Sequence, residues 1–260
     1  MARNRLPEMT RHLLMRLRAP LIAFGGETID NFGVIRDFPA LSMVTGLVAS
    51  ALGWDRSEAQ KHNQLQARIV MGARLDADGA RLVDYQTALL YKDDAGWTSL
   101  GRPEGRNKES PSYVPLPDGR KGLTLQRYRH YHADMNVLVA LRLLPAGENP
   151  TLDDLAAALD RPARPLFVGR KNCLPTDRLM AGWVEADNIL SALQFAVPDL
   201  PHDVRAQWPD GEGHLPGQQD RLLDVCDERN WTSGVHGGWR PVREGLLRFS
   251  STSTPEQAAA

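Results

Sequence analysis

The sequence predicts an α+β protein with a β-α-β-β-α-β core, an inserted hairpin and a C-terminal extension. Short apolar runs of strand length alternate with two segments of helical periodicity. A long polar region rich in proline interrupts this series, and the periodic signals weaken beyond about residue 190. With 260 residues, of which 42% are hydrophobic, the chain can bury one large core.

The first half of the chain carries a strand, a helix and two further strands. The helix has apolar residues at positions 43, 44, 47, 48, 51 and 52, the spacing of one buried face. Pro39 suits its start and Gly53 its end. The elements expected in this half are strand 12–18, helix 40–53, a polar helical piece at 57–66, and strands 67–75 and 81–91.

The insertion covers residues 93–120, a polar region that contains four prolines. Inside a compact domain, a segment of this length is usually functional or disordered. We expect it to form an extended loop or hairpin that projects from the body of the protein.

The second half supplies a strand, a helix and a strand. Residues 136–144 are nearly all apolar, which indicates a central strand. Thr151 and Asp154 have the spacing of a capping box, which predicts a helix start. The segment Pro165–Thr176, "PLFVGRKNCLPT", reads as a strand that ends at Gly169. This order is the ferredoxin-like or RNA-recognition-type (RRM) pattern.

Two regions follow from this pattern. Residues 1–190 are expected to form an RRM-like domain, and residues 191–260 a C-terminal extension that ends in a loose tail at 250–260.

The formal net charge is only −1, but the charges are unevenly distributed. Residues 1–18, 102–129 and 161–178 each carry a net charge of +4, whereas residues 185–228 carry −8. If folding gathers the three basic segments, one face would suit a polyanion and another a protein neighbour. The alternative is a mixed, solvated surface.

Several classes of protein do not fit. No apolar run approaches the roughly 20 residues of a membrane span, and no signal peptide is recognisable. Cys173 and Cys226 form neither a disulfide framework nor a metal pattern, so we expect a cytoplasmic protein. Because Walker, dinucleotide and zinc motifs are missing from the sequence, no cofactor is expected.

Four stretches, taken in order, resemble the CasD-type members of the Cas-five family, within the repeat-associated RNA-binding superfamily of CRISPR proteins. No single stretch is decisive, and their order and spacing carry the match over about residues 12–185. The stretches are 16–25, 38–53, Asp84–Thr87 together with Gln126–Tyr131 and Asp134, and Pro165–Thr176. Where Gln86 stands, the family has a histidine.

The resemblance implies a non-catalytic subunit of a type I-E CRISPR surveillance complex, Cascade, in antiviral defense. Such a subunit binds and caps the 5′ handle of the crRNA and touches target DNA only indirectly, through the complex. The partners implied are the backbone subunit CasC and the large subunit CasA. The family's protruding thumb would correspond to about residues 92–126 here.

The candidate RNA-binding residues match these stretches. Glycine lets a ligand approach the backbone, arginine offers a planar fork to phosphate, and aromatic rings stack on bases. The alternatives are a plain turn with solvated cations at Gly169, a simple helix cap at Ser42 and a packed strand aromatic at Tyr85. The candidates are Arg18, Ser42, Tyr85, Gln126, Arg127, Arg129, Tyr131, Gly169, Arg170 and Lys171.

Two other functions remain open. Relatives in type I-C systems cleave precursor crRNA, and such an endoribonuclease needs groups that move protons at the 2′-hydroxyl and the leaving oxygen. Here Lys121, His130, Tyr131 and His132 could supply them. The third possibility is a generic RNA-recognition module that acts alone as a stable monomer.

Overall fold

The computed structural model describes two compact units. Unit 1 comprises residues up to Gly25, Arg36–Arg81 and His132 onward, and unit 2 comprises Gly26–Ile35 and Leu82–Tyr131. The residues described are 9–26, 28, 30–94, 98–99, 102–103, 112–196, 200 and 203–249. The tail at 250–260 and most of the insertion between 95 and 111 lie outside them.

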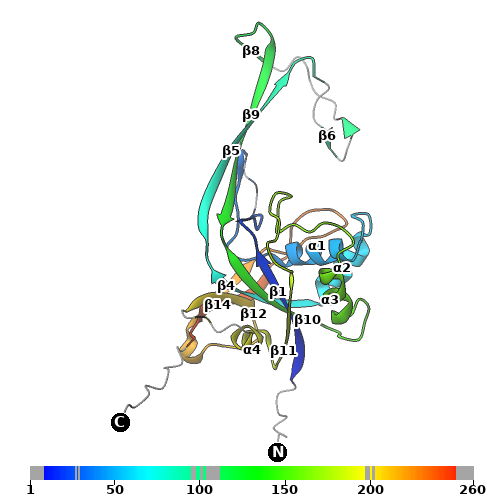
Figure 1. Ribbon diagram of the computed structural model, residues 1–260, viewed down its shortest axis with the longest axis vertical. Helices are drawn as coiled ribbons and strands as arrows, with labels where there is room; N and C mark the ends of the chain where they lie inside the picture. The colour runs from blue at the N-terminus through cyan, green and yellow to red at the C-terminus, as the bar shows by residue number, and fades with distance from the viewer. Residues whose placement is uncertain are drawn as a thin grey trace, which may run out of the picture. The chain divides into compact units, whose positions relative to one another are not determined.

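Unit 1 is built on one seven-stranded sheet in which every neighbouring pair is antiparallel (Figure 1). Its strand order is β11-β1-β10-β4-β12-β14-β13. The strands are β1 (Thr10–Arg18), β4 (Ile69–Ala77), β10 (Asn136–Leu143), β11 (Met180–Ala186), β12 (Val204–Pro209), β13 (Asp220–Val225) and β14 (Arg240–Leu247).

The centre of this sheet is β10, which pairs with β1 on one side and β4 on the other. Val139 lies opposite Met15 on β1 and opposite Ala73 on β4. Most residues of β10 are buried, so the central strand predicted from its unbroken apolar run is confirmed.

Four helices accompany the sheet. α1 (Leu41–Ala51) and α3 (Leu152–Asp160) contact each other and strands β4, β1 and β11, while α2 (Ala59–Arg68) packs on α1. α4 (Ile189–Phe195) contacts β4, β10, β11 and β12. The predicted helices 40–53 and 57–66 therefore both form, within two residues of the predicted boundaries.

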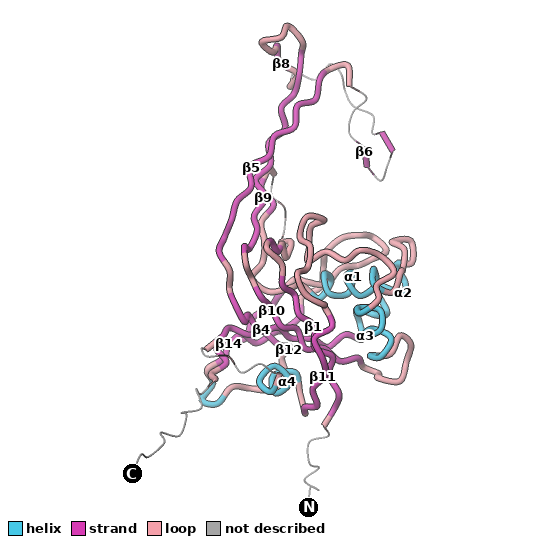
Figure 2. The backbone as a smooth tube through the Cα atoms, in the orientation of Figure 1, coloured by secondary structure: helices cyan, strands magenta, loops and turns pink. Residues whose placement is uncertain are grey.

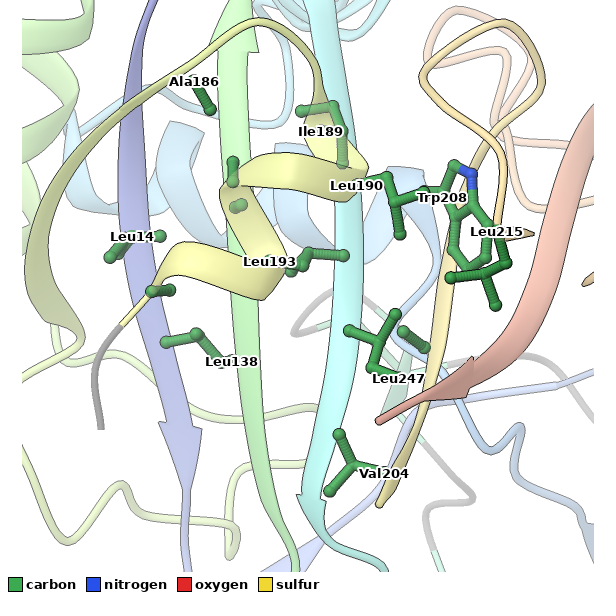
Figure 3. Packing of buried hydrophobic residues seen from close by; sticks show 14 residues of the cluster. Leu14, Leu138, Ala186, Ile189, Leu190, Leu193, Val204, Trp208, Leu215 and Leu247 are labelled. Atoms are coloured by element: carbon green, nitrogen blue, oxygen red, sulfur yellow. The ribbon is translucent and has the colours of Figure 1, made fainter. Parts of the chain in front are cut away.

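Both faces of the sheet are covered. Leu14 and Leu138 belong to the cluster that packs with Ile189 and Leu193 of α4, as Figure 3 shows. Leu13 is equally buried, and because side chains alternate along a strand it points to the opposite face. A sheet that is buried on both faces needs strands without an apolar–polar alternation, as observed in β10.

The capping box predicted at α3 is confirmed. The side chain of Thr151 accepts a hydrogen bond from the Asp154 amide at 3.2 Å, and the Asp154 carboxylate accepts one from the Thr151 amide at 2.8 Å. These two bonds satisfy backbone donors that would otherwise be orphaned at the helix start.

Unit 2 is a β-ribbon. Its long strands β5 (Ala80–Tyr91) and β9 (Lys121–Ala133) pair with each other and run side by side in Figure 1. β3 (Phe32–Gly33) is parallel to β9, and β8 (Val114–Pro115) is antiparallel to it. The short strands β6 (Thr98–Ser99) and β7 (Arg102–Pro103) form a separate pair. The first residues of β5 and the last of β9 belong to unit 1, where β2 (Leu21–Ile22) pairs with β9.

The prediction of a strand that ends at Gly169 is wrong. Residues 161–179 form turns and loop, drawn as loop in Figure 2, and the strand beside β1 on the side away from β10 is β11. Pro165 has no amide hydrogen to contribute to a ladder. Gly169 has φ of +105°, and its amide donates to the carbonyl of Phe167 at 2.9 Å, a tight turn that ends any extended run.

Residues beyond 190 contain more structure than their weak signals indicated. β12, β14 and β13 continue the same sheet beyond β4, and a 3₁₀ turn lies at Pro216–Gln218. The burial of β12 alternates strictly, with Val204, Ala206 and Trp208 inside.

Candidate nucleic-acid interface

In unit 1 the loop 165–179 runs beside the end of β1. The Arg18 carbonyl accepts the Thr176 amide at 2.9 Å, and the Val168 carbonyl accepts the Ala23 amide at 3.2 Å. These backbone bonds place Gly169, Arg170 and Lys171 on the same unit as Arg18, in a turn that the chain itself fixes.

Gly169 is required by the protein's own backbone. A Cβ built at this position would clash with the carbonyl oxygen of Ala23. Its positive φ is a second reason, because L side chains rarely adopt that conformation. The close approach that we expected a ligand to make is therefore made by Ala23.

The cations of this loop differ in their surroundings. Lys171 is exposed and forms no ion pair within the described part of the chain, whereas Arg170 is half-buried. The Arg170 carbonyl accepts the Cys173 amide at 2.9 Å, which closes the turn. Arg18 is exposed and lies 3.4 Å from Asp177. This is a weak surface ion pair, in which a phosphate could replace the Asp177 carboxylate.

Ser42 is neither the cap nor an exposed phosphate ligand. The N-cap of α1 is Ala40, which has no side-chain cap bond, and Ser42 is buried. Asp227 lies at this helix start, where its carboxylate accepts the Leu41 amide at 3.0 Å and its carbonyl accepts the Ser42 amide at 3.0 Å. Arg240 holds the same carboxylate at 2.7 Å. The anion-binding position of the α1 N-terminus is thus filled by the chain.

Ser42 and Gly169 nevertheless line one cavity of about 260 Å³, formed between α1 and the segment 165–169. Gly46 and Phe167 also line it. Small residues of α1, Gly46 and Ser50, contribute to its lining, and it has room for a small planar group.

In unit 2, β9 carries the other candidates. Gln126, Arg127 and Arg129 are exposed, and Arg127 donates to the Asn31 side chain at 2.6 Å. Tyr131 is only 1% exposed. β9 is a continuous strand, and its face that carries Arg127 and Arg129 becomes buried at Tyr131.

Tyr85 belongs to an aromatic stack that the sequence did not reveal. Tyr85 on β5 lies 5.0 Å from Tyr128 on β9, measured between ring centroids, and Phe32 on β3 lies 5.0 Å from the same Tyr128 ring. Phe32 is separated from Tyr128 by about a hundred residues of sequence, so only the parallel pairing of β3 with β9 could have disclosed it.

Of the residues considered for RNA cleavage, Lys121 lies far from the other three. Lys121 and His130 are nine residues apart on one extended strand, which places them roughly 30 Å apart at about 3.3 Å per residue. His132 is buried, and its Nε2 lies 3.0 Å from the Arg36 carbonyl. Burial lowers the pKa of His132 below its ordinary value.

Part of the acidic segment 185–228 is paired with arginines elsewhere in the chain. Arg243 contacts Asp210 at 2.6 Å and Asp220 at 2.7 Å, and Arg240 contacts Asp227. These arginines lie beyond residue 228, which is why the segment taken alone looked unbalanced.

Other features of the described residues add no second site. A larger cavity of about 850 Å³, lined by Trp54, Lys61 and Arg68 among others, contains none of the candidate residues. Among the described residues, no group of His, Cys, Asp or Glu is arranged to hold a metal ion. None of their helices is long and apolar enough to cross a membrane.

Known proteins resemble this chain in sequence and in fold. The chain is 26% identical over 193 residues to the CRISPR system Cascade subunit CasD of Escherichia coli (strain K12), covering 71% of this chain and 76% of the relative. A solved chain described as "CRISPR RNA-guided surveillance complex" superimposes with a TM-score of 0.58 at 20% identity, covering 92% of this chain and 90% of that one. Another, described as "Crystal structure of Cas protein", gives 0.50 at 24% identity, covering 91% and 94%.

These two structures share the fold of this chain. The family model described as CRISPR-associated protein (Cas5) matches residues 12–243, nearly the whole length. The chain therefore belongs to the Cas5 family of CRISPR-associated proteins.

Proposed function

We propose that this protein is a non-catalytic subunit of a type I-E Cascade complex that binds and caps the 5′ handle of the crRNA. The proposal rests on the family and on the similarity to CasD. The structural observation that carries it is the turn at Gly169–Lys171, held by backbone hydrogen bonds beside Arg18.

The chemistry of that turn suits a phosphodiester. Arg170 offers a planar fork and Lys171 a mobile charge, both placed by a turn whose backbone is already ordered, so little entropy is lost on binding. The neighbouring cavity lined by Ser42 and Gly169 would take a base or ribose of the terminal nucleotide. Ser42 would contribute there as part of the wall.

The exposed side chains of β9 would also contact the RNA. Gln126, Arg127 and Arg129 are accessible in unit 2, whereas Tyr131 would act by packing the strand. Arg18 and Arg170 belong to unit 1 and Arg129 to unit 2, and each unit would contribute its own contacts to the RNA.

We assign the ferredoxin-like arrangement to the strands β1, β4, β10 and β11. In chain order, a helix follows β1 and another follows β10, and the four strands lie in the order β11-β1-β10-β4. We further propose that the ribbon of unit 2 is the thumb, in contact with the backbone subunit CasC, that CasA lies nearby, and that the protein is cytoplasmic. The 1–190 and 191–260 division would then separate RNA-binding and accessory parts, although both contribute strands to one sheet.

The alternative is an endoribonuclease that processes precursor crRNA. It is disfavoured by the wide spacing of Lys121 and His130 and by the engagement of His132 with Arg36. Incubating the purified chain with labelled precursor repeat RNA separates the two functions. Specific cleavage that is lost in His130→Ala would establish the nuclease and refute the proposal.

The RNA-binding role is tested by co-purifying the complex with its guide. We expect Arg170→Ala and Arg129→Ala each to weaken guide retention, by about 1.5–3 kcal/mol for a lost charged hydrogen bond. Arg178→Ala is the matched control, because it removes a charge from the same basic segment outside the turn. Full RNA content and full assembly in both test variants would contradict the proposal.

A further inference from the structure

We infer that Phe32, Tyr128 and Tyr85 form a base-stacking platform on the ribbon of unit 2, on which unpaired RNA bases lie against the two end rings. The inference deepens the proposed function and rests on it. It assigns a role to two rings, Phe32 and Tyr128, that the sequence did not single out.

The geometry is that of a stack continued across three strands. Phe32 and Tyr128 are nearly parallel, with an interplanar angle of 15° and centroids 5.0 Å apart. Tyr85 meets the same Tyr128 ring at 5.0 Å with an angle of 38°. Tyr128 is thus the shared ring, and Phe32 and Tyr85 are the two ends.

The end rings are open to solvent. Phe32 is 48% exposed and Tyr85 is 51% exposed, while Tyr128 is half-buried. Rings that served only to fasten the strands would bury their faces in the stack. An aromatic face left in water can take one more planar group, and a single-stranded base is such a group.

The rings are held in place before any ligand arrives. Arg127 donates to the Asn31 side chain at 2.6 Å, and the Tyr128 amide donates to the Asn31 carbonyl at 2.9 Å. Asn31 directly precedes Phe32, so these bonds fix β3 against β9. Arg127 is accordingly a positioning residue for the platform.

Polar neighbours favour a nucleic-acid base over a protein side chain as the occupant. Gln126 and His130 lie two residues before and after Tyr128 on the same face of β9, where an amide and an imidazole can bond to base edges. Arg129 projects from the opposite face and can hold a phosphate as the RNA strand passes. Protein hot spots, in contrast, favour anchors buried in pockets, whereas the Phe32 and Tyr85 rings are about half exposed.

The test uses the full chain and a short single-stranded RNA with 2-aminopurine at successive positions. Phe32→Leu and Tyr85→Leu remove a ring but keep an apolar side chain, and Phe32→Tyr and Tyr85→Phe keep the ring. We expect each leucine variant to bind about fivefold to 150-fold more weakly, since one base stack contributes about 1–3 kcal/mol. The variants that keep the ring should bind within about twofold of wild type, as should Val83→Ala, a control on exposed β5.

A second measurement does not depend on the variants folding. With the wild-type chain, 2-aminopurine fluorescence should be quenched at one or two positions, and an abasic site there should weaken binding to the same extent as the ring-removing variant. Combining both changes should cost no more than either alone.

The outcomes are distinguishable. Leucine variants that bind RNA like wild type but lose assembly with the other subunits would overturn the platform and make the rings a protein contact. If Arg170→Ala still weakens RNA binding in that case, the proposed function stands. A wild-type chain that binds no RNA, alone or in the complex, would overturn both.

Discussion

The sheet of unit 1 and the ribbon of unit 2 use strands in opposite ways. In β10 six of the eight residues are buried, whereas in β5 eight of the twelve are exposed, three are half-buried and one, Leu90, is buried. The sheet is covered on both faces by helices, but the ribbon carries Tyr85 and Leu82 into solvent. A strand that buries little contributes little to the free energy of folding, so the side chains of the ribbon are available for contacts with other molecules.

Stability and binding are therefore expected to depend on different parts of this chain. Substitutions in the sheet should lower the free energy of unfolding, and they should affect function only by lowering the amount of folded protein. Those on the ribbon should alter binding at nearly constant stability. If this contrast holds, substitutions at buried positions of the sheet cause the largest losses of stability and substitutions on the ribbon the smallest.

The largest effect is expected at Trp208. It is 0% exposed, and its Nε1 donates to the Gly213 carbonyl at 2.9 Å. Trp208→Ala should reduce the free energy of unfolding by about 3–5 kcal/mol, measured by urea denaturation, because it leaves a large cavity and an unpaired carbonyl. Trp239→Ala is the control, since Trp239 is 71% exposed. A loss at Trp208 no larger than at Trp239 would contradict the assignment of the core.

The next effect is expected at Gly169. Gly169→Ala should reduce the free energy of unfolding by about 1–3 kcal/mol, because the added Cβ clashes with the Ala23 carbonyl and the residue has positive φ. Guide retention should fall as well, because Arg170 and Lys171 are displaced. Gly147→Ala is the matched control, as a Cβ there meets nothing within 4 Å. Unchanged stability of Gly169→Ala would show that the loop adapts freely.

A pH-dependent effect is expected from the buried His12. Burial lowers the pKa of His12 below 6.5, with Arg142 acting in the same direction and the Thr10 hydrogen bond, Glu212 and Asp187 against it. The unfolded chain therefore binds the proton first as the pH falls below 6.5, and stability is lost from there down to the lower folded pKa.

The measurement is the urea midpoint above and below pH 6.5. His12→Gln should show a smaller loss on acidification than wild type, and adding His132→Gln should reduce it again, because burial also lowers the pKa of His132. Equal acid sensitivity in all three proteins would refute this source of the pH dependence.

The smallest effect is expected on the ribbon. Val83→Thr should change the free energy of unfolding by no more than about 0.5 kcal/mol, because Val83 is 53% exposed on β5. Thermal or urea denaturation would check it. A loss comparable to that at Trp208 would mean that the ribbon is part of the cooperative core.

The sequence predicted the elements that depend on local interactions better than those that depend on long-range contacts. Where periodicity and caps act locally, as in β10 and at Thr151 of α3, the elements and their boundaries were predicted well. The strand at Gly169 was misjudged because its backbone conformation depends on Ala23, which is distant in sequence.

The site could be predicted only in part for the same reason. The exposure of Arg127 and Arg129 agrees with strand alternation, but the engagement of Leu41 and Ser42 by Asp227 joins residues about 186 apart. The pairing of Phe32 with Tyr128 likewise depends on tertiary structure. No local pattern in the sequence reports such contacts.

The most direct test is a nuclease footprint of the 5′ end of the guide RNA in the assembled complex. With the wild-type chain, the end-labelled guide should be protected at its 5′ handle, and the combined Arg170→Ala and Lys171→Ala variant should expose those nucleotides while leaving the rest of the guide covered. A 5′ handle that is equally protected with the variant, or in a complex lacking this chain, would contradict the account.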